Sequence, residues 1–158
     1  MKKEIVRDLN FLRKPCETVK EGENLKSIIQ DLRDSLDPTK GYGLSANQIS
    51  YNKRVFIVKF PKIDPKTKQV SYDEEIIINP KIIDKRFPFR FQGEGCLSLP
   101  GLKVDTLRYN FIQVEYLTEK YEPKKLGFVG LKGIIFQHES QHLLGKTILD
   151  YKYRNTKT

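Results

Sequence analysis

Two histidines and a glutamate near the end of the chain have the residue types of a catalytic metal site. They lie in the segment His138-Glu139-Ser140-Gln141-His142. Side chains four positions apart on a helix project from the same face, so both imidazoles can bind one metal ion. Glu139 lies beside them, within reach of a water on that metal. The chain has no other histidine. The competing interpretation, two histidines with ordinary hydrogen bonds, is the weaker one.

A catalytic metal site needs a third protein ligand and an open position for water. Cys96 is the best candidate because a thiolate suits a divalent transition metal. Glycines and a proline surround it in residues 93–101, which predicts a tight turn. Viewed alone, Cys96 is equally well explained as a small buried apolar residue. Cys16 is expected to be structural, and a disulfide between the two is disfavoured.

A glycine-containing segment, residues 41–49, is a further candidate for the site. Glycines let the backbone approach a ligand closely, and the amide of Gln48 can donate a hydrogen bond to a developing oxyanion. The segment lacks the pattern of a phosphate-binding loop. A loop that leads into a strand explains it equally well.

Two helices are predicted to hold these candidates in place. The first begins with a cap at Asn24, ends before Pro38 and carries apolar residues at helical spacing, namely Leu25, Ile28, Ile29, Leu32 and Leu36. The second extends from about Val129 to Gly145 and carries the two histidines on its apolar face.

Extended segments are predicted between the helices from apolar runs and from alternation, at residues 54–60, 75–79, 81–91 and 111–116. A turn at 61–68 joins the first two segments, and Pro80 is expected to end the second. This order predicts an α+β domain, with antiparallel β-sheets packed around the C-terminal HExxH helix and one N-terminal helix.

The bulk composition predicts a single catalytic domain over residues 1–158. No export signal and no membrane-spanning segment are recognisable, so we expect a cytoplasmic protein without a membrane partner. The net charge of +9 favours an anionic partner such as RNA. Because the basic residues are spread along the chain, nucleic-acid binding is the less favoured interpretation of this charge, and no DNA partner is expected.

Three segments in order resemble the signature motifs of the peptide deformylase family. They are Gly41–Gln48, Glu94–Ser98 and Gln137–Leu143. The resemblance extends over about residues 5 to 150. It implies a metal-dependent hydrolase that removes the formyl group from the N-terminal methionine of newly made polypeptides and releases formate. It also implies one divalent metal ion on Cys96, His138 and His142. We expect Fe²⁺ in the cell and Zn²⁺ or Ni²⁺ in purified protein.

The same resemblance implies roles for further residues. Glu139 would take a proton from water and pass it to the leaving amine, while Gln48 and the Leu97 backbone N–H would meet the oxyanion. Two groups would contact the peptide. The first contacts its backbone and comprises Tyr42, Gly43, Leu44, Glu94 and Gly95; the second forms the methionine pocket with His138 and comprises Ile134 and Ile135.

Two departures from the family pattern stand out. The family usually has Asp where this chain has Gln141, and that position would contact Arg108 behind the metal ligands. We expect the metal ligands to persist and their orientation to be less well held. The 13 residues after Gly145 replace a longer helix used by many bacterial relatives to dock on the ribosome. We therefore expect a short form of the family, as phage-encoded and some organellar members have, and only a loose association with the ribosome.

Two rival functions fit part of the pattern. A zinc peptidase shares HExxH but usually takes its third ligand downstream, where only Asp150 is available. A structural metal or RNA-binding module would need four protein ligands and would leave Glu139 without a task.

Overall fold

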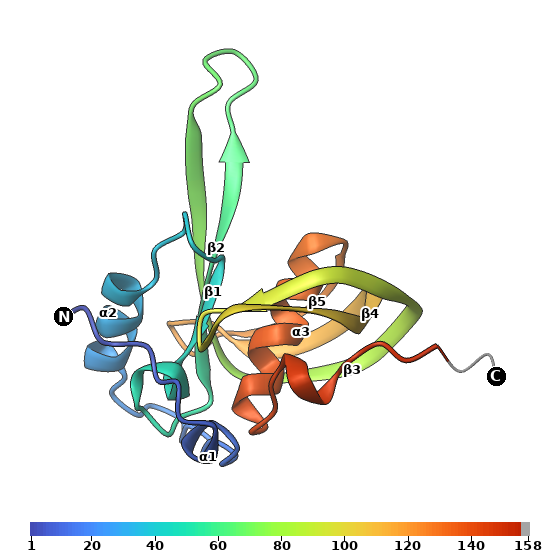
Figure 1. Cartoon of the computed structure of the whole chain (residues 1–158). Helices are drawn as coiled ribbons and strands as arrows, with labels where there is room; N and C mark the ends of the chain where they lie inside the picture. Colours follow the sequence, from blue (N-terminus) through green and yellow to red (C-terminus); the bar gives the residue numbers. More distant parts are fainter. Residues whose placement is uncertain (156–158) are drawn as a thin grey trace.

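One five-stranded antiparallel sheet, in the order β1-β2-β3-β4-β5, forms the centre of the molecule (Figure 1). This computed structural model describes residues 1–155, and the part of the predicted tail at 156–158 lies outside them. The α+β prediction is confirmed. In chain order the elements are α1 (Leu9–Leu12), α2 (Lys26–Ser35), β1 (Gly43–Ser45), η1 (Ala46–Ile49), β2 (Val55–Ile63), β3 (Val70–Cys96), β4 (Leu99–Leu117), β5 (Pro123–Val129), α3 (Leu131–Leu143) and η2 (Ile148–Asp150).

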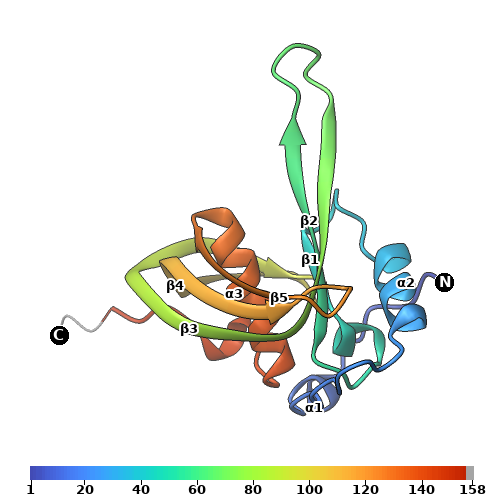
Figure 2. The same ribbon diagram turned by 180° about the vertical axis from the view of Figure 1, so that it is seen from behind.

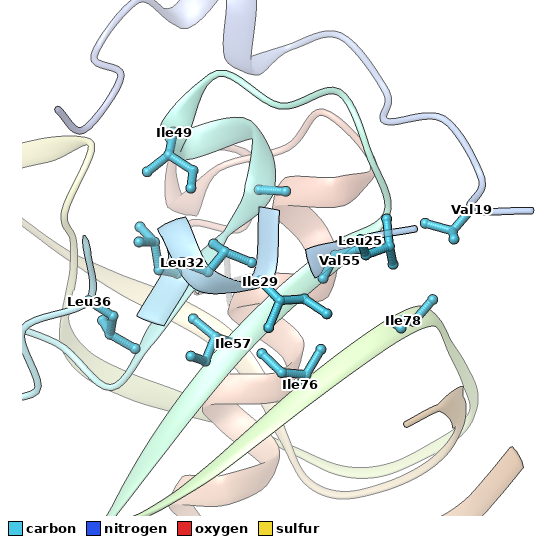
Figure 3. Packing of buried hydrophobic residues seen from close by; sticks show 12 residues of the cluster. Val19, Leu25, Ile29, Leu32, Leu36, Ile49, Val55, Ile57, Ile76 and Ile78 are labelled. Atoms are coloured by element: carbon cyan, nitrogen blue, oxygen red, sulfur yellow. The ribbon is translucent and has the colours of Figure 1, made fainter. Parts of the chain in front are cut away.

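The first part of β2, residues 55–58, is buried on both faces, which explains its continuous apolar sequence. Successive side chains of a strand point to opposite faces, so Val55 and Ile57 pack toward α2. There they meet the apolar face of the helix, including Ile29 and Leu32, as Figure 3 shows. This α2 core is a cluster of buried residues: Val19, Leu25, Ile29, Leu32, Leu36, Leu44, Ala46, Ile49, Val55, Ile57, Ile76 and Ile78.

The opposite face of β2 packs against α3. Phe56 and Phe136 lie edge to face, with ring centroids 5.2 Å apart, a favoured aromatic geometry. The sheet curves so that β3, β4 and β5 lie around α3 (Figure 2). This α3 core comprises Cys16, Phe56, Val58, Phe60, Ile77, Ile112, Val114, Tyr116, Ile135, Phe136 and Leu143. The helix that carries the histidines is therefore fixed by apolar packing along its length.

The prediction that Pro80 ends a strand is wrong. β3 continues through Pro80 to Cys96, and the register with β4 shifts between Ile78 and Lys81. Asn79 has φ +49° at this irregularity. A bulge leaves a residue outside the hydrogen-bonded ladder, so a proline without an N–H is accommodated there. Segments 75–79 and 81–91 are thus one strand, not two.

Other observed boundaries also differ from the predicted ones: β3 begins at Val70, before the predicted segment 75–79, and β4 begins at Leu99, 12 residues before the predicted segment 111–116. α2 begins at Lys26, so its N-cap residue is Leu25 and not the predicted Asn24. The Asn24 side chain still accepts a hydrogen bond from the Lys26 N–H. The β2–β3 hairpin continues through Ile63 before it turns, and it projects far from the body (Figures 1 and 2). The elements α1, β1, η1, β5 and η2 were not predicted. No helix within residues 1–155 is long and apolar enough to cross a membrane.

Gly145 ends α3 as predicted, and it permits a close contact with the N-terminal segment. Its φ is +78°, and a Cβ at this position would lie 2.3 Å from the Arg13 carbonyl oxygen. Gly22 has a similar φ of +77° but nothing within 4 Å of such a Cβ. A comparison of substitutions at Gly145 and Gly22 therefore separates the cost of backbone strain from the cost of steric overlap.

We expect Gly145→Ala to lower the free energy of unfolding by about 3 kcal/mol, because overlap adds to left-handed strain. The control Gly22→Ala should cost only about 1 kcal/mol, from strain alone. Urea unfolding of both variants measures the difference. Equal losses would show that the contact with Arg13 relaxes without cost.

Candidate metal centre and active site

Helix α3 holds the two histidines and the glutamate on the side that faces β1 and the β3–β4 connection. Their burial is high: His142 is fully buried, Glu139 is 3% exposed, and the His138 side chain is 11% exposed. The helical spacing expected from the sequence brings the two imidazole Nε2 atoms to 3.2 Å from each other.

Cys96 reaches the same point from the last position of β3. It pairs with Leu99 at the start of β4, so a two-residue turn follows it directly. The Sγ atom lies 3.3 Å from His142 Nε2. The ligand atoms of Cys96, His138 and His142 all lie within 4.8 Å of one another. Both cysteines are free thiols, so the disfavoured disulfide is not formed.

These three donors fit one divalent metal ion. Nitrogen and sulfur ligands at ~2.0–2.3 Å from a tetrahedral ion are about 3.3–3.6 Å apart, close to the separations seen here. Lone pairs that face one another this closely repel unless a proton or a cation lies between them. Two imidazoles and a thiolate also suit a transition metal better than Mg²⁺ or Ca²⁺.

The rival third ligand is engaged elsewhere. Asp150 Oδ2 accepts a hydrogen bond from the Thr147 N–H at 2.9 Å and caps η2. Within the described part of the chain, the metal-ligand cluster contains three residues and no fourth. A closed structural site is therefore not formed, and a downstream ligand of the peptidase kind is not supplied.

Glu94 supports His138 from behind. One carboxylate oxygen lies 2.7 Å from His138 Nδ1 and accepts a hydrogen bond from Arg108 Nη2 at 2.5 Å. The other accepts from Thr106 Oγ1 and Arg108 Nε. Burial opposes ionisation of Glu94, but the hydrogen bonds from Arg108 and His138 outweigh it and hold its pKa at about 2. The carboxylate thus fixes the orientation of the His138 ring.

Gln141 contacts Arg108, as expected from the sequence. Its Oε1 accepts a hydrogen bond from Arg108 Nη1 at 2.5 Å. Arg108 is fully buried, and its charge is compensated by Glu94, because Gln141 carries none. The guanidinium therefore joins α3 to β3 through one carboxylate and one amide.

The pKa values of the two imidazoles are shifted in opposite directions. Burial opposes protonation of both rings. For His138, the nearby Glu139 and hydrogen bonds with Cys96 and Glu94 outweigh burial and raise the pKa to about 10. Burial and the neighbouring His138 hold the pKa of His142 well below its ordinary value. Metal binding at such a pair would displace a proton from His138.

Glu139 lies where a proton acceptor is useful. Its Oε2 is 4.0 Å from His138 Nε2, and its Oε1 has no hydrogen-bond partner among the described residues. Burial raises the pKa of this carboxyl to about 7. The carboxylate packs against the backbone of β1: a Cβ added to Gly43 would lie 2.6 Å from Oε2. Only glycine leaves this space.

Gln48 is held next to Cys96 by the short helix η1. Its Oε1 accepts hydrogen bonds from the N–H and hydroxyl of Ser45, each at 3.0 Å. Its Nε2 donates to Ser98 Oγ at 3.0 Å and lies 3.8 Å from Cys96 Sγ. Because Oε1 is occupied by donors, the Nε2 end must face the metal residues.

A cavity of about 470 Å³ opens beside these groups. It is bordered by most of the residues expected to contact substrate or metal: Tyr42, Gly43, Gln48, Glu94, Gly95, Cys96, Leu97, Ile134, Ile135, His138 and Glu139. Leu44 has its side chain in the α2 core, so only its backbone is available. Glu94 reaches the border, but its carboxylate is turned to Arg108 and His138.

Sequence reasoning missed part of the cavity wall. Phe91, Leu131 and residues 99–103 also border it. Residues 99–103 directly follow the Cys96 turn, so a hairpin assignment at that turn would have placed them opposite Gly93 and Glu94. No local pattern marks Phe91 or Leu131 as wall residues.

Known proteins resemble this chain over nearly its whole length. A family profile described as polypeptide deformylase matches residues 2–158. The peptide deformylase of Aquifex aeolicus is 35% identical over 92% of this chain and 87% of that protein. The peptide deformylase of Karelsulcia muelleri is 37% identical over 92% and 75%, respectively.

The fold comparison agrees with the sequence comparison. The crystal structure of a peptide deformylase from Legionella pneumophila superposes with a TM-score of 0.82 at 28% identity. The superposition covers 97% of this chain and 87% of the Legionella chain. With the matched profile over nearly the whole sequence, these similarities show that the chain belongs to the polypeptide deformylase family.

Proposed function

We propose that this enzyme removes the formyl group from the N-terminal formyl-methionine of newly made polypeptides and releases formate. The observation that carries the proposal is the convergence of Cys96, His138 and His142 beside a cavity that also holds Glu139. The third metal ligand is Cys96, which precedes α3 in the chain, and zinc peptidases usually take theirs from a residue after the HExxH helix. This difference favours deformylation over proteolysis.

When bound at this site, a divalent cation supplies a Lewis acid and lowers the pKa of a water. Glu139 acts as the proton-transfer residue: it takes a proton from the attacking water and gives it to the leaving amine. Its unpartnered Oε1 and its position beside His138 support this role. The bond broken joins the formyl carbon to the methionine nitrogen.

Gln48 and Leu97 stabilise the oxyanion that forms on the formyl group. The Gln48 Nε2 end faces Cys96, and Ser45 fixes the amide in that orientation. Leu97 follows Cys96 in the turn, so its backbone N–H lies at the same border of the cavity. Donors held in place before the reaction cost no reorganisation when the charge develops.

The peptide binds as an added strand between β1 and the Gly95 segment. β1 is at one end of the sheet and pairs only with β2, so its other edge can accept a strand through Tyr42, Gly43 and Leu44. The methionine side chain enters the apolar part of the cavity at Ile134 and Ile135, next to His138. Glu94 contacts the peptide through its backbone, and its carboxylate fixes the orientation of His138.

We further propose Fe²⁺ as the metal in the cell, with Zn²⁺ or Ni²⁺ in purified protein. A Cys-His-His donor set accepts all three, so affinity order alone does not determine occupancy. The chain acts as one catalytic domain in the cytoplasm. Its +9 charge supports loose association with the ribosome.

Replacement of Glu139 tests the chemical assignment. We expect Glu139→Gln to lower kcat for a formyl-Met tripeptide by at least ~10²-fold, because the proton-transfer group is removed. Formate release by anaerobically purified protein loaded with Fe²⁺ or Ni²⁺ measures the effect. Metal content should be unchanged. The exposed Glu122→Gln is the control, and it should retain full activity. Absence of formate from the unaltered enzyme would refute the proposed function.

Gly43 tests the position of the glutamate without changing its chemistry. We expect Gly43→Ala to reduce kcat by about 10–100-fold, since an added methyl would displace the Glu139 carboxylate. Metal analysis should show full occupancy. Gly41→Ala is the matched control, because its Cβ would meet only the Leu97 side chain at 3.4 Å. Equal kinetics for both variants would contradict the assigned position of Glu139.

Gln141 tests whether the departure from the family pattern matters. We expect Gln141→Asp to improve metal retention and kcat/KM by up to about 10-fold, because a carboxylate would hold Arg108 more firmly behind His138. Gln141→Asn is the control: it shortens the side chain without adding charge and should bring no gain. Dialysis against a chelator followed by metal analysis measures retention. No change in either quantity would refute the idea.

A further inference from the structure

A second cavity lies on the face of α3 that points away from the metal residues. It is about 600 Å³ in volume, and we name it the rear groove. Its lining residues on α3 and just after it are Gln137, Ser140, Gln141 and Leu144. These alternate along the helix with His138, Glu139 and His142, which face the other side. None of the steps of deformylation uses the rear groove.

We propose that the rear groove and the β3 segment beside it bind single-stranded RNA. The choice of RNA as the polyanion rests on the proposed function, because newly made chains reach this enzyme from an RNA-rich ribosome. Binding itself is argued from the charges, the rings and the backbone of the surface.

Positive charge predominates in the rear groove. Arg54, Lys81 and Lys85 line it, against one acidic residue, Asp84. Asp84 is already paired with Arg86 at 2.9 Å. Arg54 is half-buried; its Nη2 donates a hydrogen bond to the Pro80 carbonyl oxygen at 2.6 Å, and it forms no ion pair within residues 1–155. A half-buried cation without a counter-charge favours an anionic ligand such as a phosphate group.

Aromatic side chains accompany these cations. Tyr109 and Tyr151 line the groove. Phe87, two residues after Lys85, is 67% exposed. Proteins that bind single-stranded nucleic acid combine a positive groove with exposed rings on which bases stack. In the rear groove, Lys85 already lies over the Tyr109 ring and Arg108 over the Tyr151 ring. The exposed ring of this surface is therefore Phe87, on the β3 segment beside the groove.

The backbone at Phe87 is strained, and its ring is exposed. Phe87 has φ +61°, a conformation that costs a bulky residue about 1–2 kcal/mol. It lies between Arg86 and Pro88, which pair with Phe111 and Tyr109 of β4. Glycine or asparagine would adopt this conformation more easily. Strained positions are often retained for function, and an exposed ring contributes little to packing.

The surrounding segment is a local exception to the even spread of charge along the chain. Residues 85–91 alternate between basic and aromatic side chains, as Lys-Arg-Phe-Pro-Phe-Arg-Phe. Arg90 lies over the ring of Tyr153 and pairs with Asp105. This run begins at Lys85, which lines the rear groove, and it ends at Phe91, which lines the cavity beside the metal residues.

The test measures binding of a fluorescein-labelled twelve-nucleotide uridine RNA by anisotropy, using the full chain with its metal. Phe87→Gly should weaken binding at least about 5-fold, the lower end of the range for one stacked base. The same variant should be as resistant to urea as the unaltered protein or more so, because glycine relieves the strain. A structural role for the ring would instead lower the resistance to urea.

Removal of charge gives an independent measurement. The double variant Lys81→Gln/Lys85→Gln should reduce the slope of log affinity against log salt by about 1.4, or ~0.7 for each phosphate that is no longer neutralised. The matched control Lys66→Gln/Lys68→Gln removes the same charge from the projecting hairpin and should leave the slope unchanged. Formate release should be unaffected by all these variants.

Several results would overturn the inference. They are no RNA binding by the unaltered protein, equal effects in the groove and hairpin variants, or unchanged RNA affinity in Phe87→Gly. Binding to vesicles with anionic headgroups that displaces the RNA and depends on Phe87 would assign the surface to a membrane instead. Because formate release is assayed separately, a failure here leaves the deformylation proposal intact, and the reverse also holds.

Discussion

The buried ion pair between Arg108 and Glu94 connects the sheet to the catalytic helix. Both residues are nearly inaccessible to solvent, and their closest atoms are 2.5 Å apart. Glu94 holds His138, and Arg108 holds Gln141, so two strands and α3 share one electrostatic contact. Loss of one partner from such a pair typically costs about 3–5 kcal/mol, since the other charge remains buried. The orientation of the His138 ring thus depends on a buried ion pair that lies behind it.

Backbone irregularities give one strand several tasks. β3 begins in the projecting hairpin, lies beneath α2, passes the bulge at Asn79 and Pro80, and ends at Cys96. Further register shifts follow Phe91 and Glu94. Glu94 and Cys96 are two positions apart, so strand alternation directs both side chains to the same face. There Glu94 contacts His138 and Cys96 contacts His142.

Patterns that act locally were predictable from the sequence. The α2 face, the apolar β2 run and the spacing of His138 and His142 each depend on neighbouring residues, and each was predicted. β5 was missed because its side chains are mostly exposed and show no alternation. The prediction of the partners of Arg108 was also incomplete. Gln141 was expected, whereas Glu94 lies on the neighbouring strand, and no local pattern specifies which residues pair across two strands. The prediction that Pro80 ends a strand was wrong because the bulge that accommodates this proline arises from the pairing of β3 with β4.

Helix α3 separates two surfaces whose requirements differ. Toward the metal residues, space is so restricted that Gly43 must lack a side chain beside Glu139. On the opposite face, Gln141 lines the rear groove and also holds Arg108. A neutral amide at this position forms a weaker hydrogen bond with the buried guanidinium than a carboxylate would. Among the described residues, Gln141 therefore leaves Glu94 as the carboxylate that compensates Arg108, and it leaves the rear groove without a further negative charge. Both consequences follow from the one position where the chain departs from its family's motif.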